Sequence, residues 1–156
     1  MSATLAHELE TLGETSPSGY AVGLHVRFTS PSYLFQTYPP AWNEFYSSQG
    51  LVMRDPTVTW GFANEGAVRW SALAGDDTAG VLSRAAEHGL IYGVAGSVLS
   101  GGSRTIAGFA RADREFTDDE MSVLMSAVTK MHDLTADEQS VSREDRATIQ
   151  AHSITV

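Results

Sequence analysis

Residues 38–46 read Tyr-Pro-Pro-Ala-Trp-Asn-Glu-Phe-Tyr, and the fold prediction starts from this stretch. Proline disfavours a helical conformation at the residue before it but is well accepted in the first turn of a helix. The two prolines therefore predict a helix over residues 40–48 that ends at Gly50. Trp42 and Tyr46 lie four residues apart and share one face of this helix.

A second helix start follows at residues 55–58, which read Asp-Pro-Thr-Val. Asp55 is expected to act as the N-cap and the proline after it to occupy the first helical position, so that the helix covers residues 56–64. A short strand is expected over residues 67–71, and it carries Trp70. This part of the chain thus concentrates aromatic side chains with polar tips around one carboxylate.

The rest of the chain alternates between helical and extended patterns. Helices are expected over residues 3–12, 78–88 and 117–132, and strands over residues 20–28, 92–100 and 105–112, with a Gly-Gly hairpin turn at residues 100–103, whereas residues 32–37 fit neither pattern clearly. This order predicts an α+β fold, an α/β/α sandwich in which an antiparallel sheet of about five strands is flanked by helices on both faces.

The composition is typical of one soluble globular domain. The chain has 156 residues, of which 42% are hydrophobic and 19% charged, so it can bury a core and is too apolar for general disorder. The net charge of −9 repels phosphate backbones, so direct nucleic-acid binding is not expected. The sequence has no cysteine, no basic and apolar leader, and no apolar run near the roughly 20 residues of a membrane span. We therefore expect a cytoplasmic protein without a membrane partner.

The character of the sequence changes after residue 132. Residues 133–156 are polar and charged, with few apolar residues at helical spacing. This pattern predicts a solvated tail that carries one weak helix at most. The expected division is a folded domain over residues 1–132 and a polar C-terminal tail over residues 133–156.

Signals of enzymatic chemistry are weak. The five histidines, at positions 7, 25, 88, 132 and 152, do not form a metal-ligand pair at helical or zinc-site spacing. The glycines between Gly93 and Gly102 match neither a phosphate-binding loop nor a nucleophile elbow, and a hairpin explains them. The sequence therefore predicts no enzyme, no metal and no cofactor.

The aromatic residues Tyr38, Trp42, Tyr46 and Trp70 and the carboxylate of Asp55 suit a binding pocket. Each also has an ordinary structural explanation, since a Trp on a helix face more often belongs to the core and an Asp before Pro more often caps a helix. Their concentration argues for more, because buried polar tips need partners. Those partners are either an internal network or a polar-headed ligand in an apolar cavity.

The spacing of these five residues resembles the autoinducer-binding domain of LuxR-type quorum-sensing regulators. Tyr-Pro-x-x-Trp-x-x-x-Tyr, followed by Asp-Pro-Thr-Val and then Trp70, is similar to the signature of that family. Residues 86–93, Ala-Glu-His-Gly-Leu-Ile-Tyr-Gly, resemble the segment before the family's central hairpin. The resemblance covers residues 5–132. It implies an α/β/α sandwich that binds an N-acyl homoserine lactone between the sheet and one helical layer.

The resemblance also implies a role for each matching residue. Trp42 would donate its indole N–H to the lactone carbonyl, and Asp55 would accept the amide N–H of the ligand. Tyr38 would donate to the acyl carbonyl, Trp70 would pack against the lactone ring, and Tyr46 would line the passage for the acyl chain. The chemistry agrees, because an ionised carboxylate only accepts, whereas indole N–H and phenol O–H groups donate.

The central hairpin departs from the family pattern. The family usually has Thr or Ser two residues after the glycine that matches Gly93, and Pro two residues later, whereas this chain has Ala95 and Ser97. A further Ser or Thr often lies on the second hairpin strand, where this chain has Ala110, or Phe109 if the alignment shifts by one residue. Ala95 and Ala110 are therefore expected among the ligand-binding residues, and with Gly96 they leave room for a bulky acyl tail. The missing hydroxyls indicate an unusual acyl homoserine lactone or a different ligand.

A second departure concerns regulation. LuxR-type regulators normally continue into a helix-turn-helix DNA-binding domain. Residues 134–138, Leu-Thr-Ala-Asp-Glu, resemble its start, but no basic recognition helix follows. Residues 133–156 are therefore interpreted as the remnant of a linker to an absent DNA-binding domain. The chain is then either an excised ligand-binding domain or a natural protein that lost its DNA reader.

These expectations lead to two hypotheses about function. In the first, the chain is a sensor for an N-acyl homoserine lactone or a related amphipathic signal in quorum-sensing transcriptional regulation. It would act without its own DNA-binding domain, as an anti-activator that forms heterodimers with a full-length LuxR-type regulator. In the alternative, it is a dimerisation module that pairs with itself or such a regulator and no longer binds the lactone.

Overall fold

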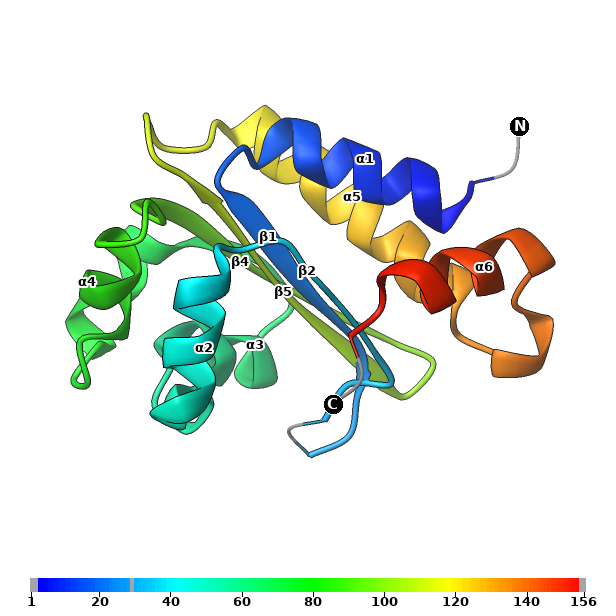
Figure 1. Cartoon of the computed structure of the whole chain (residues 1–156), viewed down its shortest axis with the longest axis horizontal. Coiled ribbons are helices and arrows are strands. Elements are labelled where there is room, and N and C mark those ends of the chain that lie inside the picture. The colour runs from blue at the N-terminus through cyan, green and yellow to red at the C-terminus, as the bar shows by residue number, and fades with distance from the viewer. Residues whose placement is uncertain (1–2, 29, 155–156) are drawn as a thin grey trace.

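A five-stranded antiparallel sheet lies at the centre of the fold, and helices cover both of its faces (Figure 1). The computed structural model describes residues 3–28 and 30–154. The strand order is β2-β1-β5-β4-β3. The strands are β1 (Gly19–Val26), β2 (Tyr33–Gln36), β3 (Gly66–Arg69), β4 (Tyr92–Ser100) and β5 (Ser103–Arg111). The predicted α+β sandwich is therefore confirmed, and the ambiguous residues 32–37 contain an edge strand.

Helices α1 (Leu5–Thr15) and α5 (Asp118–Leu134) pack side by side on one face of the sheet (Figure 1). Helix α5 begins with the predicted capping box, in which the Thr117 hydroxyl accepts from the Glu120 amide and the Glu120 carboxylate accepts from the Thr117 amide. Apolar residues of both helices meet the sheet in one buried cluster, which includes Leu5, Leu12, Val22, Phe35, Phe109, Leu124, Val128 and Met131.

The opposite face carries a layer of short helices. These are α2 (Pro40–Ser48), the 3₁₀ turn η1 (Leu51–Met53), α3 (Pro56–Ala63), the 3₁₀ helix η2 (Trp70–Asp76) and α4 (Val81–Ala86). The predicted helix over residues 40–48 is confirmed, and Asp55 caps α3 as expected. A second buried cluster, which includes Trp42, Leu51, Trp70, Val81, Leu90, Ala95 and Ala110, holds this layer against the sheet.

Two local predictions on this face need correction. Trp70 does not lie on a strand, because β3 ends at Arg69 and Trp70 is the first residue of η2. The helix expected over residues 78–88 is shorter and covers only Val81–Ala86. It begins late because Gly80 adopts a left-handed conformation and the Asp77 side chain accepts from the amides of Val81 and Leu82. Tertiary packing of the Trp70 ring and a local cap set these boundaries.

The C-terminal segment is more ordered than a solvated tail. Helix α6 (Arg143–His152) packs against α1, and its Asp145, only 2% exposed, accepts the Leu5 amide at 2.9 Å. Beyond α6, the Ile154 amide donates to the Leu34 carbonyl on the edge strand β2 at 2.8 Å. The prediction of a solvated tail is thus wrong for the described residues of this segment, because capping and edge pairing hold it to the domain.

Candidate ligand-binding site

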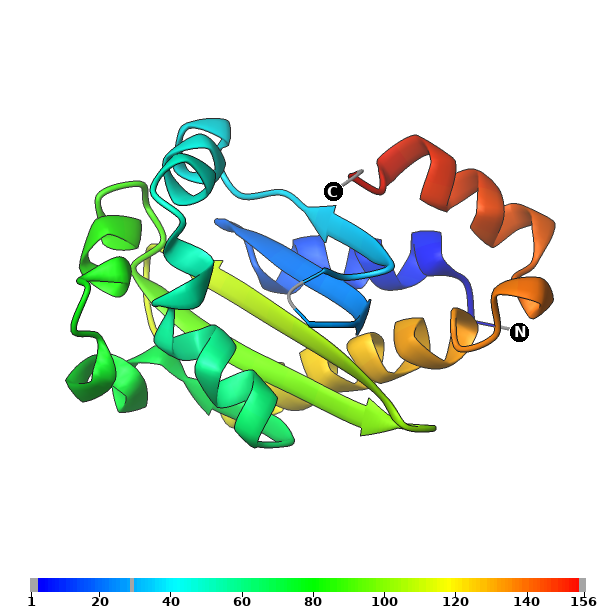
Figure 2. The ribbon, with the colours of Figure 1, turned by 90° about the horizontal axis from the view of Figure 1, so that it is seen from below.

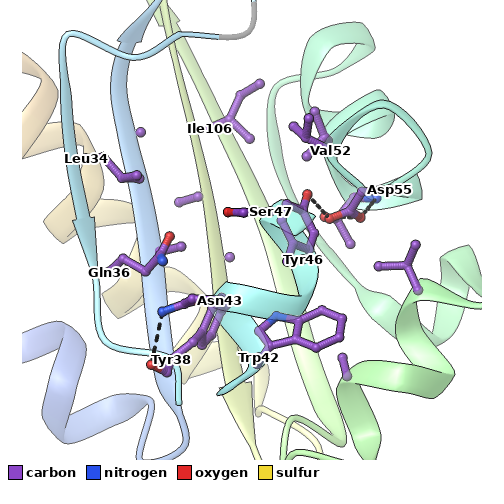
Figure 3. A pocket seen from close by; sticks show the side chains of 18 of the residues that line it. Leu34, Gln36, Tyr38, Trp42, Asn43, Tyr46, Ser47, Val52, Asp55 and Ile106 are labelled. Atoms are coloured by element: carbon purple, nitrogen blue, oxygen red, sulfur yellow. Dashed lines mark hydrogen bonds between the residues drawn. The ribbon is translucent and has the colours of Figure 1, made fainter. Parts of the chain in front are cut away.

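A cavity of about 360 Å³ lies between the sheet and the helical layer that contains α2, α3 and α4 (Figure 3). Pockets for small ligands commonly measure roughly 300–1,000 Å³. Its walls are mostly apolar. Strands β1, β2 and β5 contribute Ala21, Gly23, Leu34, Gln36, Ile106 and Gly108, and the helical layer contributes Trp42, Tyr46, Val52, Val58, Phe62, Val81 and Leu82.

Five of the seven predicted site residues line this cavity, namely Tyr38, Trp42, Tyr46, Asp55 and Trp70. Ala95 and Ala110 are not among the lining residues. Both alanines are fully buried in the same cluster as Trp42 and Trp70. In the β4–β5 pairing, Ala95 lies opposite Gly108 and Ala110 opposite Gly93. Their contact with a ligand stays a prediction.

The Asp55 carboxylate is the most highly hydrogen-bonded group of the cavity. Its Oδ1 accepts the Thr57 amide at 2.9 Å and the Thr57 hydroxyl at 2.7 Å, and its Oδ2 accepts the Tyr46 hydroxyl at 2.7 Å (Figure 3). A carboxylate has about four acceptor positions. Asp55 therefore caps α3 with one oxygen and keeps one acceptor position on the other oxygen for a further donor.

Two tyrosine hydroxyls lie at the same cavity. Burial raises the pKa of Tyr38 well above its ordinary value of 10.0, and the negative charge of Asp55 raises it further. Burial also raises the pKa of Tyr46, as do the charge of Asp55 and the hydrogen bond to it. Both phenols therefore stay protonated at physiological pH, and each is a hydrogen-bond donor.

The indole rings of the site are held by close packing. Trp42 is 4% exposed, and its ring centroid lies 5.7 Å from that of Tyr46 and 5.4 Å from that of His88. Trp70 lies flat against β4, where a Cβ at Gly93 would overlap the indole. Among the described residues, the buried Nε1–H of Trp70 has no hydrogen-bond partner. The site thus holds two closely packed indoles, and the N–H of Trp70 is a buried donor without a partner.

Four polar residues of the cavity wall, Gln36, Asn43, Ser47 and Thr57, were not predicted. Thr57 is the residue whose amide and hydroxyl donate to Asp55. The Asn43 amide nitrogen donates to the Tyr38 carbonyl at 3.2 Å and so restrains the segment that carries Tyr38 (Figure 3). Asn43 and Ser47 each directly follow a predicted site residue on α2, and this spacing is the signal that could have found them. Gln36 lies on β2, whose sequence pattern was ambiguous, so no comparable signal existed for it.

Within residues 3–28 and 30–154, no group of three or more His, Cys, Asp or Glu side chains could hold a metal ion. In the same part of the chain, none of the helices combines the length and apolar character needed to cross a membrane.

An α/β/α sandwich with a mostly apolar cavity and a few buried polar groups defines a small-molecule-binding domain. Comparison with known protein families identifies the family to which this domain belongs. The family described as the autoinducer binding domain matches residues 18–136, and the chain belongs to this family. The resemblance to LuxR-type regulators is therefore confirmed.

Individual relatives support the assignment. The transcriptional activator protein SolR of Ralstonia nicotianae is 33% identical over 79 residues, which are 50% of this chain and 34% of SolR. The matched segment therefore spans about a third of the length of that relative.

Solved structures show the same fold. SdiA, a protein of Escherichia coli, in complex with octanoyl-rac-glycerol has a TM-score of 0.63 and 21% identity, over 91% of this chain and 64% of that chain. CepR2 of Burkholderia cenocepacia, an N-acylhomoserine lactone dependent LuxR family transcription factor, has a TM-score of 0.53 and 16% identity, over 87% and 93% of the two chains.

Proposed function

We propose that this domain senses an N-acyl homoserine lactone or a closely related amphipathic acyl signal in quorum-sensing transcriptional regulation. The observation that carries the proposal is the Asp55 carboxylate, whose Oδ2 accepts the Tyr46 hydroxyl and keeps a further acceptor position, in the same mostly apolar cavity that Trp42 lines. Family membership supports it. SdiA is seen in complex with octanoyl-rac-glycerol, and CepR2 depends on N-acylhomoserine lactone. Both of these ligands join a polar head to an acyl chain.

In the proposed complex the polar head lies between α2 and the start of α3. Asp55 Oδ2 accepts the amide N–H, and the Trp42 indole donates to the lactone carbonyl. Tyr38 donates to the acyl carbonyl. Tyr46 lines the cavity, as the resemblance implies, and also holds the Asp55 carboxylate in place. Trp70 packs against the lactone ring. Ala95 and Ala110, which belong to the same buried cluster as Trp42 and Trp70, are proposed to shape the side of the site that holds the acyl carbonyl.

The test is thermal unfolding with a panel of acyl homoserine lactones and octanoylglycerol. A ligand that binds only the native state raises its melting temperature in a saturable way. Asp55→Asn and Trp42→Phe are expected to abolish the rise while the protein still folds. Asp77→Asn is the matched control, because Asp77 also caps a helix, α4, but does not line the cavity.

The outcomes separate the two functions considered for this chain. Full affinity in both site variants would refute the site. No response of the wild-type protein to any acyl ligand would refute the sensor and favour the dimerisation module.

We further propose that the chain acts through a protein partner, either a second copy of itself or a full-length LuxR-type regulator, in the cytoplasm. Its net charge of −9 makes it a poor ligand for a phosphate backbone. As an anti-activator it would pair with that regulator and lower the regulator's binding to promoter DNA. Co-purification with a LuxR-type regulator, together with reduced binding of that regulator to promoter DNA, tests this role. Unchanged DNA binding in the presence of excess chain contradicts it.

The division into a sensor domain over residues 1–132 and a C-terminal segment over residues 133–156 also stays a proposal. A variant that ends at His132 tests it. A ligand response equal to that of the full chain supports the boundary, and loss of folding contradicts it.

A further inference from the structure

Two side chains from the central hairpin hold the C-terminal end of α3. The Ser97 hydroxyl donates to the Gly61 carbonyl at 2.7 Å. Arg104 Nη1 lies 2.7 Å from three acceptors, the carbonyl oxygens of Gly61 and Asn64 and the Ser97 hydroxyl. We call this arrangement the Ser97–Arg104 clamp.

The clamp provides hydrogen-bond donors for carbonyl groups at the C-terminal end of α3. The last four carbonyls of a helix have no partner within it, and this end carries a partial negative charge. The Asn64 side chain covers the Trp60 carbonyl at 3.1 Å, and the clamp covers that of Gly61. A guanidinium at this position forms charge-assisted hydrogen bonds and also favours the helix dipole. Since Ser97 is 1% exposed, its hydroxyl is shielded from competing water.

The clamp lies at a close contact between α3 and the sheet. A Cβ added at Gly61 would lie 3.0 Å from the Ile106 side chain, so the helix backbone rests directly on β5. Ile106 is the cross-strand partner of Ser97 in the β4–β5 hairpin. Figure 2 shows α3 lying across the two long strands of this hairpin. The clamp and the contact surface between helix and sheet therefore form one unit.

This contact bounds one part of the cavity. Val58 and Phe62 line it from α3, and Ile106 lines it from β5. All three side chains are apolar, so they suit an acyl chain rather than a polar head. A shift of α3 away from β5 would widen this part of the cavity. The N-terminal end of the same helix carries Asp55, so α3 connects the clamp to the polar group of the site.

We propose that Ser97 and Arg104 are specificity-determining positioning residues, which set the separation of α3 from β5 and thereby select the length and bulk of the acyl chain. This inference rests on the proposed function of the cavity. It gives a role to Ser97, one of the positions at which the sequence departs from the family pattern, because a side chain without a hydroxyl could not donate to Gly61. Arg104 acts through α3 and needs no contact with the ligand.

The first measurement uses no ligand. Hydrogen exchange of the amides of residues 59–63 is compared in the wild type, Arg104→Met and Ser97→Ala. We expect about ten-fold faster exchange in both variants, because the end of α3 opens more readily without its partners. Arg69→Met is the matched control, since Arg69 also donates to a backbone carbonyl, that of Phe116 at 2.8 Å, and does not line the cavity. It should leave these amides unchanged.

The second measurement determines Kd by titration calorimetry for butanoyl, octanoyl and dodecanoyl homoserine lactone. Arg104→Met should change the ratio of Kd between the longest and shortest ligands at least about five-fold. Arg69→Met should keep it within about two-fold, since the Arg69 guanidinium donates to Phe116 and Asp118 and not to α3. Arg104→Lys, which keeps the charge but not the fork, should fall between them. It also serves if the methionine variant does not fold.

The outcomes are distinct. Unchanged exchange in both clamp variants overturns the positioning role, whatever the ligand result. Faster exchange with an unchanged Kd ratio overturns the specificity role. A wild type that binds no lactone refutes the proposed function, and with it the selection of acyl chains, while the exchange measurement still decides whether the clamp positions α3.

Discussion

The Tyr46 hydroxyl donates a 2.7 Å hydrogen bond to Oδ2 of Asp55, and this bond joins the last turn of α2 to the N-cap of α3. Both residues line the cavity, and Asp55 is only 8% exposed. The carboxylate is therefore oriented before any ligand arrives. Preorganisation of this kind lowers the entropic cost of binding.

Tyr46→Phe removes this hydrogen bond and keeps the aromatic ring. A hydrogen bond to a charged group contributes roughly 1.5–3 kcal/mol, so we expect the free energy of unfolding to fall by about 2 kcal/mol in urea denaturation. Tyr33→Phe is the control, because Tyr33 lies on β2 and is not among the cavity-lining residues. Equal losses in the two variants would contradict a special role for the bond.

Gly93→Ala tests the packing of Trp70. A Cβ at residue 93 would overlap the indole, and overpacking of a core commonly costs about 1–3 kcal/mol. We expect a loss of that size, with a change in Trp fluorescence. Gly13→Ala is the matched control: no atom lies within 4 Å of its added Cβ, and in helix α1 the change should stabilise by roughly 0.5–1 kcal/mol. A stable Gly93→Ala protein would show that the ring can move.

Asp145→Ala tests whether α6 stabilises the domain. Asp145 accepts the amide of Leu5 at the positive end of α1, and its loss leaves a buried donor unpaired. An unpaired buried group costs about 1–3 kcal/mol, and we expect a decrease of that order in the free energy of unfolding. Glu144→Ala, at the exposed neighbouring position, should have little effect. Similar small effects in both variants would show that α6 docks without stabilising α1.

Glu120→Gln tests how much the Glu120 carboxylate in the first turn of α5 contributes to stability, and how that contribution depends on pH. The Arg114 guanidinium, and then the Thr117 amide, lower the pKa of the Glu120 carboxyl from its ordinary 4.5 to about 2. Because the folded-state pKa is lowered, this stabilisation is fully present above about pH 4.5 and is lost as the pH falls toward about 2. The wild type should therefore exceed Glu120→Gln in stability near pH 7, and the difference should shrink over that acidic range. The exposed Asp119→Asn is the control for the loss of one charge, and a difference that does not change with pH would contradict the expectation.

Local chemistry was enough to predict much of the fold from the sequence. Pro40 at a helix start, Asp55 before Pro56 and the Thr117 capping box act within a few residues, so their signals survive without tertiary context. Five of the residues that line the cavity, Tyr38, Trp42, Tyr46, Asp55 and Trp70, were likewise predicted, because their spacing matches a family that the comparisons confirm. What the sequence by itself determined, therefore, is where elements begin and which side chains gather at the cavity.

Only the tertiary structure decided which hydrogen-bond partners and packing contacts these side chains have. The bond between Tyr46 and Asp55, the clamp on Gly61 and the contact of Asp145 with Leu5 join residues that are 9, 36 and 140 positions apart. The position of Trp70 at the start of η2 depends on Gly93 of β4, because the indole occupies the space that a Cβ at residue 93 would fill. A hydrogen-bond partner or a packing surface from a distant segment leaves no periodic trace in the sequence. The packing of the helical layer on the sheet therefore decides which polar groups remain for a ligand.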